Sequence, residues 1–495
     1  MHVRVVKTFP GLLPADDDHP YRTGAHRPNL TEVDATDLTV VAGEIPEDLE
    51  GVYLRNTENP ILPALGRYHP FDGDGMIHAA HFHDGVADYR NRVVRTEGLA
   101  AELEAGEPLW AGIVDSPALS KRDGWGARTR MKDASSTDVA VHDGVALSTF
   151  YQCGDAYQLD PVTLEDRGPA PWARPAALDG LGVSAHLKTD PRTGELLFFN
   201  YGTTAPFFHL GVLDRQGKLT QHIPVPLPGP RLPHDIAFTE RFVIVNDLPL
   251  FWDPALLARG AYRARFAKEL PSRFGLVDRR PGQAQGTVRW FEADPTYVLH
   301  WVNAYDDGDL VVLEGFHQSN PNVAPRAGDG KYDILNRSID MHEFGSRLHR
   351  WTFDLRTGTT REERLDDRCA EFPMIHAAFT GVRHRFTYAM VGAPGGFLFS
   401  GLVRYDGATG EQQRYAFPDG VFASESPFAP RTGSTAEDDG YLVTFVSDLR
   451  NDTSECQVFD ARDLARGPIA RARLPERISS GTHSCWAPAG ELRRA

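Results

Sequence analysis

Four histidines that lie far apart in the sequence share a similar setting and could carry out metal chemistry. Each lies within or at the end of a short apolar run of the kind that forms a β-strand. They are His186, His234, His300 and His483. Neutral imidazoles that reach one point from separate strands can build an all-nitrogen site for a redox-active metal such as iron. The pattern therefore favours an oxygen-handling enzyme over a hydrolase or a binding module.

The elements that must position these histidines are short strand-like runs, because helical periodicity is scarce. Several turns between the runs share one chemistry: the side chain of an Asp caps the turn, and a following Gly supplies a positive φ in most of them. These turns begin at Asp160, Asp190, Asp214, Asp354 and Asp406. Hairpins that recur through a long chain are typical of radial sheets. The sequence therefore predicts an all-β fold, a β-propeller.

The best helical pattern covers residues 251–270. We expect it to belong to an insertion over about 249–274 that forms part of a helical and loop cap over the top face of the propeller. The alternatives are a solvated helix packed on the propeller, or one that touches a lipid surface through its apolar side. For the domains, we expect an N-terminal arm over residues 1–34 and a single catalytic propeller over 35–495.

Bulk composition excludes several classes of protein. Hydrophobic residues make up 41% of the 495 residues, which is enough for a large core, and the formal charge of −16 argues against nucleic-acid binding. The four cysteines form no CxxC pair, so we expect neither a thiolate zinc site nor a disulfide framework. No apolar segment has the length of a membrane span or the pattern of a signal peptide. We therefore expect a cytoplasmic protein with at most peripheral membrane contact.

Ordered motifs along the chain resemble those of the carotenoid cleavage oxygenases, from about residue 35 to the C-terminus. They are GVYLRNTENP (51–60), YHPFDGDGMIHAAHF (68–82), SAHLKTDPRTGEL (184–196), PHDIAFTERFVIVNDLPL (233–250), the His300 strand, the EFP at 371–373 and the terminal GTHSCW. The resemblance implies a seven-bladed β-propeller with one Fe(II) per chain and O₂ as co-substrate. It also implies that His186, His234, His300 and His483 are the iron ligands.

The same resemblance implies a set of carboxylates that hold the ligand histidines through their non-coordinating nitrogens. Two of the family's three match Glu371 and Glu425, while Gln152 takes the third place. The amide oxygen of Gln152 can still accept that hydrogen bond, but it brings no charge. We therefore expect iron binding to survive, with one ligand less electron-rich. The alternative is that all three are ordinary polar residues at strand edges.

Residues 71–78, FDGDGMIH, contain two aspartates spaced loosely like those of a calcium loop. No bidentate Glu follows at the right distance, so we expect a tight turn with Phe71 facing the substrate cavity. In the strand that follows, His81 and His83 share one face and His78 takes the other, because side chains alternate. This split favours structural roles for all three histidines over metal binding.

Residues 130–155 are similar to the same segment of the lignostilbene dioxygenases, the branch that cleaves stilbenes and related phenylpropenoids. In that branch a lysine binds the 4-hydroxyl group of the substrate, and Lys132 falls on it. An ammonium beside a phenol stabilises phenolate, which pushes electron density into the conjugated alkene. The alternative is a surface lysine in a loop. Thr57 and Glu58 stand where the family usually has Gly-Pro.

These features predict an Fe(II)-dependent dioxygenase that cleaves an alkene conjugated to a 4-hydroxyphenyl ring into aldehydes. Its substrate would be a small aromatic alkene: a stilbenoid, a lignostilbene or a phenylpropenoid such as isoeugenol. Two alternatives stay open. One is an apocarotenoid or carotenoid cleavage dioxygenase, and the other is a propeller that has lost catalysis and serves as a binding scaffold.

Overall fold

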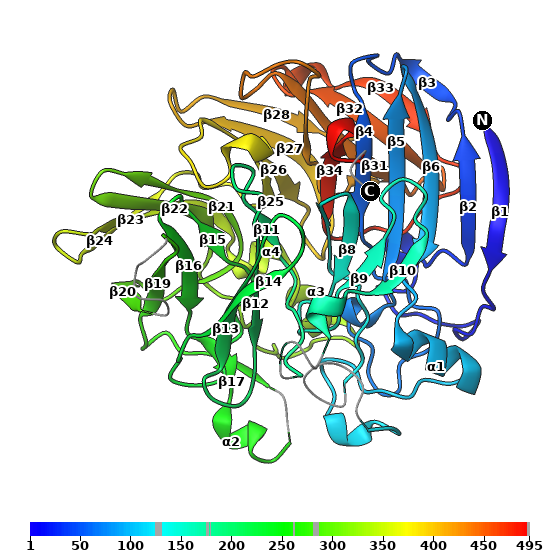
Figure 1. The fold of residues 1–495 in the computed structure, drawn as a ribbon. Coiled ribbons are helices and arrows are strands. Elements are labelled where there is room, and N and C mark those ends of the chain that lie inside the picture. Colours follow the sequence, from blue (N-terminus) through cyan, green and yellow to red (C-terminus); the bar gives the residue numbers. More distant parts are fainter. Residues whose placement is uncertain (124–130, 175–177, 179, 261–262, 281–286, 493–495) are drawn as a thin grey trace. The chain divides into compact units, whose positions relative to one another are not determined.

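The computed structural model describes residues 1–123, 131–174, 178, 180–260, 263–280 and 287–492. The chain forms two compact units, and the regular structure of each is mainly antiparallel strands (Figure 1). Unit 1 contains Met1–Val183, Phe399–Arg404 and Gln412–Ala495, and unit 2 contains Ser184–Leu398 and Tyr405–Glu411. Unit 2 therefore holds His186, His234 and His300, whereas His483 belongs to unit 1.

Unit 1 contains a six-stranded sheet in which the last strand of the chain pairs with a strand near its beginning. In spatial order its strands are β1 (His2–Thr8), β2 (Thr31–Thr36), β6 (Val86–Val93), β5 (Met76–His83), β4 (Gly51–Arg55) and β34 (Ser484–Pro488). Part of the predicted N-terminal arm thus forms β1 and most of β2, which pair with each other. The β34–β4 ladder pairs Ser484 with Arg55, and so it places His483 directly before a fixed strand.

The remaining strands of unit 1 form two further groups, and a strand pair joins the second group where Phe399 pairs with Ala423. The first group is β7 (Asp138–His142), β8 (Val145–Thr149), β9 (Tyr157–Leu159) and β10 (Asp166–Pro169). The second is β29 (Val421–Ala423), β31 (Gly440–Asp448), β32 (Thr453–Asp460), β33 (Pro468–Arg473) and β3 (Val40–Gly43), with β30 (Phe428–Pro430) beside β31. The strand β28 (Gln412–Ala416) pairs with β27 (Phe399–Asp406). Two helices of unit 1 are α1 (Glu97–Ala105) and α5 (Ala489–Leu492).

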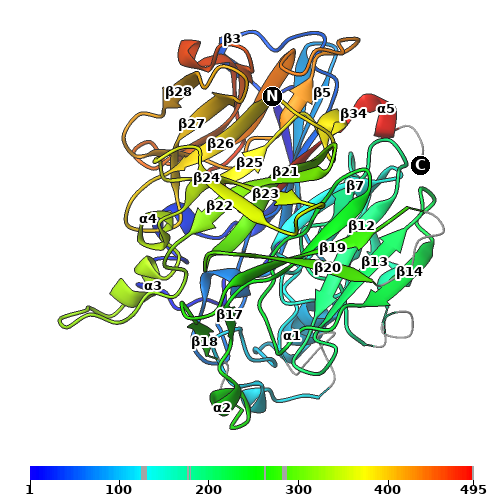
Figure 2. The same ribbon diagram turned by 90° about the vertical axis from the view of Figure 1, so that its left-hand side faces the viewer.

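Unit 2 repeats the same hairpin-based construction. Its four-stranded sheets are β11 (Lys188–Thr189), β12 (Leu196–Tyr201), β13 (Phe208–Leu213) and β14 (Leu219–Pro224); β15 (Ala237–Phe238), β16 (Phe242–Asp247), β19 (Ser272–Asp278) and β20 (Val288–Ala293); and β21 (Tyr297–Asp307), β22 (Leu310–Gln318), β23 (Arg347–Asp354) and β24 (Thr360–Arg364). Strands β12, β13 and β14 lie side by side in Figure 2. Two pairs complete the unit: β25 (Ala370–Met374) with β26 (Phe386–Gly392), and β17 (Leu250–Trp252) with β18 (Ala264–Phe266). Its helices are α2 (Pro254–Leu257), α3 (Asp333–Arg337) and α4 (Met341–Phe344).

The core of unit 2 supports the strand that carries His300. Trp301, the next residue, packs edge-on against Trp351 with ring centroids 5.6 Å apart, and Phe274 lies 5.9 Å from Trp301. All three side chains are buried. Aromatic pairs of this kind contribute about 0.5–1.5 kcal/mol each beyond the burial of their area. These contacts therefore anchor Trp301 in the core directly beside His300, at a point where the β21–β22 register shifts.

The predicted Asp turns are confirmed at all five positions. Asp354 is typical: its Oδ1 accepts the N–H groups of the residues two and three positions on, at 2.8 and 3.0 Å. Gly358 then takes a φ of 77°, where a Cβ would be strained. The turn that begins at Asp160 differs, because Leu164 takes the left-handed conformation there with a φ of 57°.

The predicted helix over 251–270 is wrong for most of its length. Within the described residues of that segment only α2 is helical, capped by Asp253, which accepts the backbone N–H of Ala255 at 2.9 Å. The flanking residues instead form the β17–β18 ladder, which buries the three side chains of β17. Gly260, with a φ of 75°, ends the helical run. Pairing along this ladder outweighed the helical periodicity.

In the part of the chain that the structure describes, no helix combines the length and the apolar character needed to cross a membrane.

Candidate metal centre

Unit 2 brings three of the four predicted ligands together. His186 lies two residues before β11, His234 lies three residues before β15, and His300 lies within β21. The ring centroids of His186 are 4.8 Å from those of His234 and 4.9 Å from those of His300, and the last two rings are 5.2 Å apart. Their ligand nitrogens lie within 4.8 Å of one another. Imidazoles from β21 and from the residues before β11 and β15 therefore converge.

The backbone at His186 is strained to achieve this arrangement. Its φ is 66°, in the left-handed region that a non-glycine residue enters at a cost of about 1–3 kcal/mol. The side chain is 4% exposed. Strained backbone of this kind persists where the surrounding structure holds a functional side chain in place.

Asp235 connects all three segments, and the sequence reasoning missed it. Its carboxylate is 1% exposed; Oδ1 lies 2.9 Å from Lys188 Nζ and Oδ2 accepts the backbone N–H of Trp301 at 3.0 Å. Its backbone carbonyl accepts the indole N–H of Trp301 at 3.2 Å. Burial raises the pKa of Asp235, and Lys188 opposes that rise. Asp235, which follows His234, thus binds both Trp301 and Lys188. Trp301 follows His300, and Lys188 lies two positions after His186. The sequence signal that could have indicated Asp235 is its position directly after the candidate ligand His234, as a His-Asp dipeptide.

The carboxylate of Glu371, on β25, lies behind His300. Its Oε2 is 2.7 Å from His300 Nδ1 and also accepts the backbone N–H of Phe372 at 2.8 Å. The Phe372 ring stacks on the imidazole with centroids 5.1 Å apart. A carboxylate on Nδ1 fixes the tautomer in which Nε2 is the ligand atom. The contact that the sequence analysis expected for Glu371 is present.

The fourth predicted ligand has a similar arrangement within unit 1. His483 Nδ1 lies 3.4 Å from Glu425 Oε1, a longer contact than that of His300 with Glu371. Glu425 is also bound by the backbone N–H of Ser484, and its own carbonyl accepts the Tyr53 hydroxyl at 3.0 Å. Both His483 and Glu425 are buried. The β34–β4 ladder therefore fixes this pair.

Gln152 and Phe71 belong to unit 1 and each has a relation to Tyr151. Gln152 is half-buried in the turn after β8, next to Tyr151. Phe71, also half-buried, makes an edge-on contact with Tyr151, with ring centroids 5.8 Å apart. The roles expected for Gln152 behind a ligand and for Phe71 in the substrate cavity stay predictions.

The acidic residues of segment 71–78 serve the fold of unit 1. Asp72 accepts the backbone N–H of Ile113 at 2.9 Å, and Asp74 accepts that of Ile61 at 3.2 Å. His78 is fully buried, and its Nδ1 lies 2.7 Å from the Tyr89 hydroxyl. These contacts support the predicted turn and the structural role of His78.

Lys132 lies between two buried carboxylates of unit 1. Its Nζ is 2.8 Å from Asp74 Oδ1 and 3.1 Å from Glu102 Oε2, and its side chain is 13% exposed. Burial lowers the pKa of Lys132, but the two carboxylates outweigh that effect and the pKa lies above its ordinary value. The ammonium of Lys132 therefore forms ion pairs with both carboxylates.

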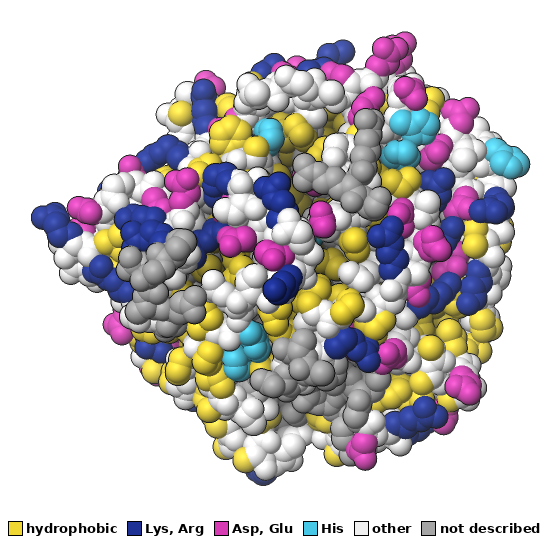
Figure 3. Space-filling view, viewed as in Figure 1, with side chains coloured by type: hydrophobic (Ala, Val, Ile, Leu, Met, Phe, Trp, Pro, Cys, Tyr) yellow, Lys and Arg dark blue, Asp and Glu magenta, His cyan; other side chains and the backbone are white. Residues whose placement is uncertain are grey.

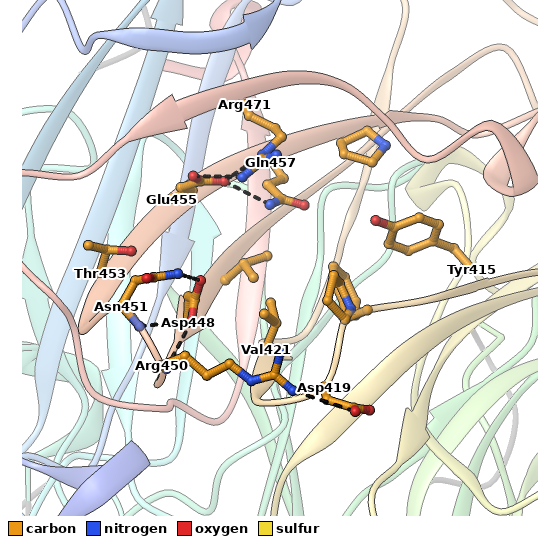
Figure 4. A pocket seen from close by; sticks show the side chains of 14 residues that line it. Tyr415, Asp419, Val421, Asp448, Arg450, Asn451, Thr453, Glu455, Gln457 and Arg471 are labelled. Carbon is orange, nitrogen blue, oxygen red and sulfur yellow. Dashed lines mark hydrogen bonds and ion pairs between the residues drawn. The ribbon is translucent and has the colours of Figure 1, made fainter.

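A separate pocket of about 180 Å³ lies on the surface of unit 1 among β29, β31, β32 and β33 (Figure 4). Its polar side chains largely bind one another: Arg471 pairs with Glu455 at 2.7 Å, and Asn451 donates to Asp448 at 2.6 Å. Pockets for small molecules typically measure about 300–1,000 Å³. This pocket is smaller than that range, so we do not assign an aromatic alkene to it.

Comparisons with known proteins show which family the chain resembles. The family model described as retinal pigment epithelial membrane protein matches residues 26–488. The chain is 31% identical to lignostilbene-alpha,beta-dioxygenase isozyme III of Sphingomonas paucimobilis, over 95% of this chain and 97% of the relative. It is also 31% identical to a carotenoid cleavage oxygenase of Mycobacterium tuberculosis, over 96% of this chain and 98% of the relative.

A solved structure agrees with the fold. The crystal structure of Pseudomonas brassicacearum lignostilbene dioxygenase matches with a TM-score of 0.83 at 28% identity, and the match covers 95% of this chain and 99% of that one. The predicted all-β propeller is thereby confirmed. The chain belongs to the retinal pigment epithelial membrane protein family, that of the carotenoid cleavage oxygenases, and is an alkene-cleaving oxygenase.

Proposed function

We propose that this chain is an Fe(II)-dependent dioxygenase that cleaves an alkene conjugated to a 4-hydroxyphenyl ring into two aldehydes. The observation that carries the proposal is the convergence of His186, His234 and His300, with Glu371 in contact with His300 Nδ1. A buried group of neutral imidazoles held by carboxylates suits a redox-active metal better than a hard cation such as Mg²⁺.

The donor set of the proposed centre is the three converging histidines together with His483. Four neutral ligands leave a bound Fe(II) with its full dipositive charge, and the bound iron would supply the activation of O₂. Glu371 and Glu425 hold the Nδ1 atoms of His300 and His483. We assign the same role to Gln152, whose amide oxygen would accept a hydrogen bond from a ligand histidine but carries no charge. The centre therefore has two charged supports and one neutral support.

For the substrate, we propose that Lys132 binds the 4-hydroxyl group through its ammonium group. Because Asp74 and Glu102 already surround the ammonium, the three groups together carry a net negative charge. That charge opposes the formation of phenolate next to Lys132. Lys132 would then orient a neutral phenol by a hydrogen bond, and Phe71 with Tyr151 would contact its ring.

Cleavage of an apocarotenoid is the second candidate. It is favoured by the carotenoid relative, whose identity of 31% equals that of the lignostilbene relative. The two carboxylates on Lys132 favour it as well, because a polyene needs no ammonium partner.

The deciding experiment incubates iron-loaded protein with isoeugenol, resveratrol and a β-apocarotenal under O₂ and identifies the aldehydes by mass spectrometry. We expect the phenolic alkenes to give aldehydes, and a His300→Ala variant to give none from any substrate. Aldehyde from the apocarotenal alone would overturn the phenolic assignment. Protein that binds no iron when it is produced with ample iron would overturn the catalytic proposal itself.

A further inference from the structure

We propose that unit 1 carries a second metal site, formed by His81, His83 and Asp88 on the β5–β6 hairpin, which binds a late first-row divalent cation such as Zn²⁺ or Cu²⁺. Each of the three side chains offers one ligand atom, and these atoms lie within 4.8 Å of one another. The sequence analysis favoured structural roles for the two histidines. The proposal is independent of the iron centre and of the substrate.

The register of the hairpin places the three side chains on one face. His81 and Asp88 are directly opposite each other across the β5–β6 ladder, and His83 is two residues beyond His81 on the same strand. Residues two apart on a strand share a face, and directly opposed residues have adjacent side chains. The three ligands therefore need no loop to bring them together.

The turn that joins the two strands fixes this register. Asp84 and Gly85 link β5 to β6 with φ values of 48° and 72°. A two-residue loop with two positive φ angles and an Asp-Gly sequence is the tight connection that matches the twist of a hairpin. The spacing of His81, His83 and Asp88 is thus set by the backbone before any metal binds, which lowers the entropic cost of binding.

The ring geometry resembles that of the buried group. The centroids of His81 and His83 are 4.9 Å apart, the same separation as between His186 and His300. His83 Nε2 lies 3.5 Å from Asp88 Oδ2. Small χ rotations of these partly exposed side chains would bring the ligand atoms to the usual bond lengths of about 2.0–2.2 Å.

The site is open to solvent, and its ligands select the type of metal. All three side chains are partly exposed, and Figure 3 shows His side chains at the surface over β5 and β6 with acidic side chains around them. Two imidazoles and one carboxylate suit Zn²⁺ or Cu²⁺, whereas Ca²⁺ and Mg²⁺ prefer oxygen ligands alone. Water would complete the coordination, so a cation can bind there without any opening of the fold.

A histidine pair that lies across two strands elsewhere in the molecule provides the control. His209 and His222, on β13 and β14, stack with ring centroids 4.9 Å apart. Within the described residues, this pair belongs to no group of three metal-ligating side chains. A site that depends on the carboxylate should therefore exist at the β5–β6 hairpin and not at the β13–β14 hairpin.

The test is calorimetric titration of iron-loaded protein with ZnCl₂, with iron measured before and after, so that exchange at the buried centre is detected. We expect one Zn²⁺ to bind without loss of iron, and His83→Gln or Asp88→Asn to weaken it by about tenfold or more. His209→Gln should leave the titration unchanged. Cu²⁺ in place of Zn²⁺ should show coupling to two nitrogens by electron paramagnetic resonance, lost in His81→Gln.

Three outcomes would overturn the site: no Zn²⁺ bound beyond the iron, equal affinity in the His83→Gln and wild-type proteins, or an equal loss in His209→Gln. Because the three ligands are partly exposed, we expect the thermal unfolding of the metal-free variants to match that of the metal-free wild type. Zn²⁺ should raise the melting temperature of the wild type and not that of His83→Gln, because a ligand that binds only the folded state stabilises it.

Discussion

The molecule contains two groups of histidines with nearly the same ring spacing, one largely buried in unit 2 and one partly exposed on unit 1. His186 and His300 have ring centroids 4.9 Å apart, as do His81 and His83. The groups differ in what surrounds the rings. Spacing alone therefore does not distinguish a catalytic centre from a surface that merely binds cations.

The position of the carboxylate is the clearest difference. Glu371 lies behind His300 and contacts its Nδ1, where it orients the ring and leaves Nε2 for a metal. Asp88 instead lies beside His83 among the ligand atoms themselves. A metal on the exposed group would lose part of its charge to Asp88, whereas one among neutral imidazoles keeps it. A metal bound to the buried group would therefore be the stronger Lewis acid.

The largest expected effect comes from a ligand of the buried group. His300→Ala should remove iron and reduce alkene cleavage by about 10³-fold or more, since a bound metal contributes several kcal/mol to such reactions. Metal analysis and aldehyde yield measure the two effects. His83→Ala is the matched control and should change neither. Equal losses from both variants would remove the distinction between the two groups.

Lys132 tests whether burial among carboxylates marks a functional group or only a structural one. Lys132→Met leaves Asp74 and Glu102 buried without their cation, and we expect it to lower the free energy of unfolding by about 3–5 kcal/mol. Lys121→Met is the control, because Lys121 pairs with Glu107 at the surface at 2.7 Å and such pairs contribute about 0–1 kcal/mol. Urea denaturation measures both.

A substrate role for Lys132 predicts a further change in that variant. At a temperature where it is folded, it should lose kcat/KM for isoeugenol by a larger factor than for a β-apocarotenal. An equal loss of kcat/KM for the two substrates would indicate that Lys132 is a structural residue. It would also favour apocarotenoid cleavage as the function.

The carboxylates behind the ligands should have smaller and unequal effects. Glu371→Gln should weaken iron binding by about 10–100-fold, as is usual for groups that orient metal ligands. Glu425→Gln should weaken it less, because the contact of Glu425 with His483 is 3.4 Å and that of Glu371 with His300 is 2.7 Å. Iron release to a chelator, followed over time, ranks the two. The reverse order would contradict the geometric argument.

Asp235 should have an effect of about tenfold on iron affinity, without any contact of its own with the metal. Asp235→Asn removes the charge that binds Lys188 and weakens the acceptor of the Trp301 N–H. Since Trp301 follows His300, the ring position should become less defined. Lys188→Met separates the two contacts: if it reproduces the loss, the ion pair matters, and if it does not, the Trp301 contact does.

Much of the fold could be predicted because its signals are local. The Asp turns depend on two to five consecutive residues, and all five are present. The helix over 251–270 failed because the β17–β18 ladder joins residues more than ten positions apart. A local periodic pattern contains no information about a pairing strand that far away in the sequence. Helix and hairpin were therefore indistinguishable in that segment.

The same limit applies to the candidate site. His186, His234 and His300 could be predicted from strand context and family motifs, and Glu371 from its motif. The partners of Lys132 could not, because Asp74 and Glu102 are 58 and 30 residues away in sequence and no local pattern links them to Lys132. Asp235 was missed for a related reason. Its contacts with Lys188 and Trp301 form only in the folded chain, where β21 and β11 lie beside the segment before β15.

The smallest expected effect is at Gln152, and it bears most directly on the role of charge behind the ligands. Gln152→Glu restores the family's third carboxylate and should slow iron release by a few-fold, below the range of about 10–100-fold expected for Glu371→Gln. Gln152→Ala removes the hydrogen-bond acceptor and should speed release. If the Glu and Ala variants release iron at the wild-type rate, Gln152 does not hold a ligand, and two carboxylates suffice for the centre. If Glu slows and Ala speeds release, the half-buried turn after β8 supports the centre as Glu371 does. The buried centre would then differ from the His81, His83 and Asp88 group in two ways. Its rings are more buried, and more of them are oriented by a hydrogen-bond acceptor.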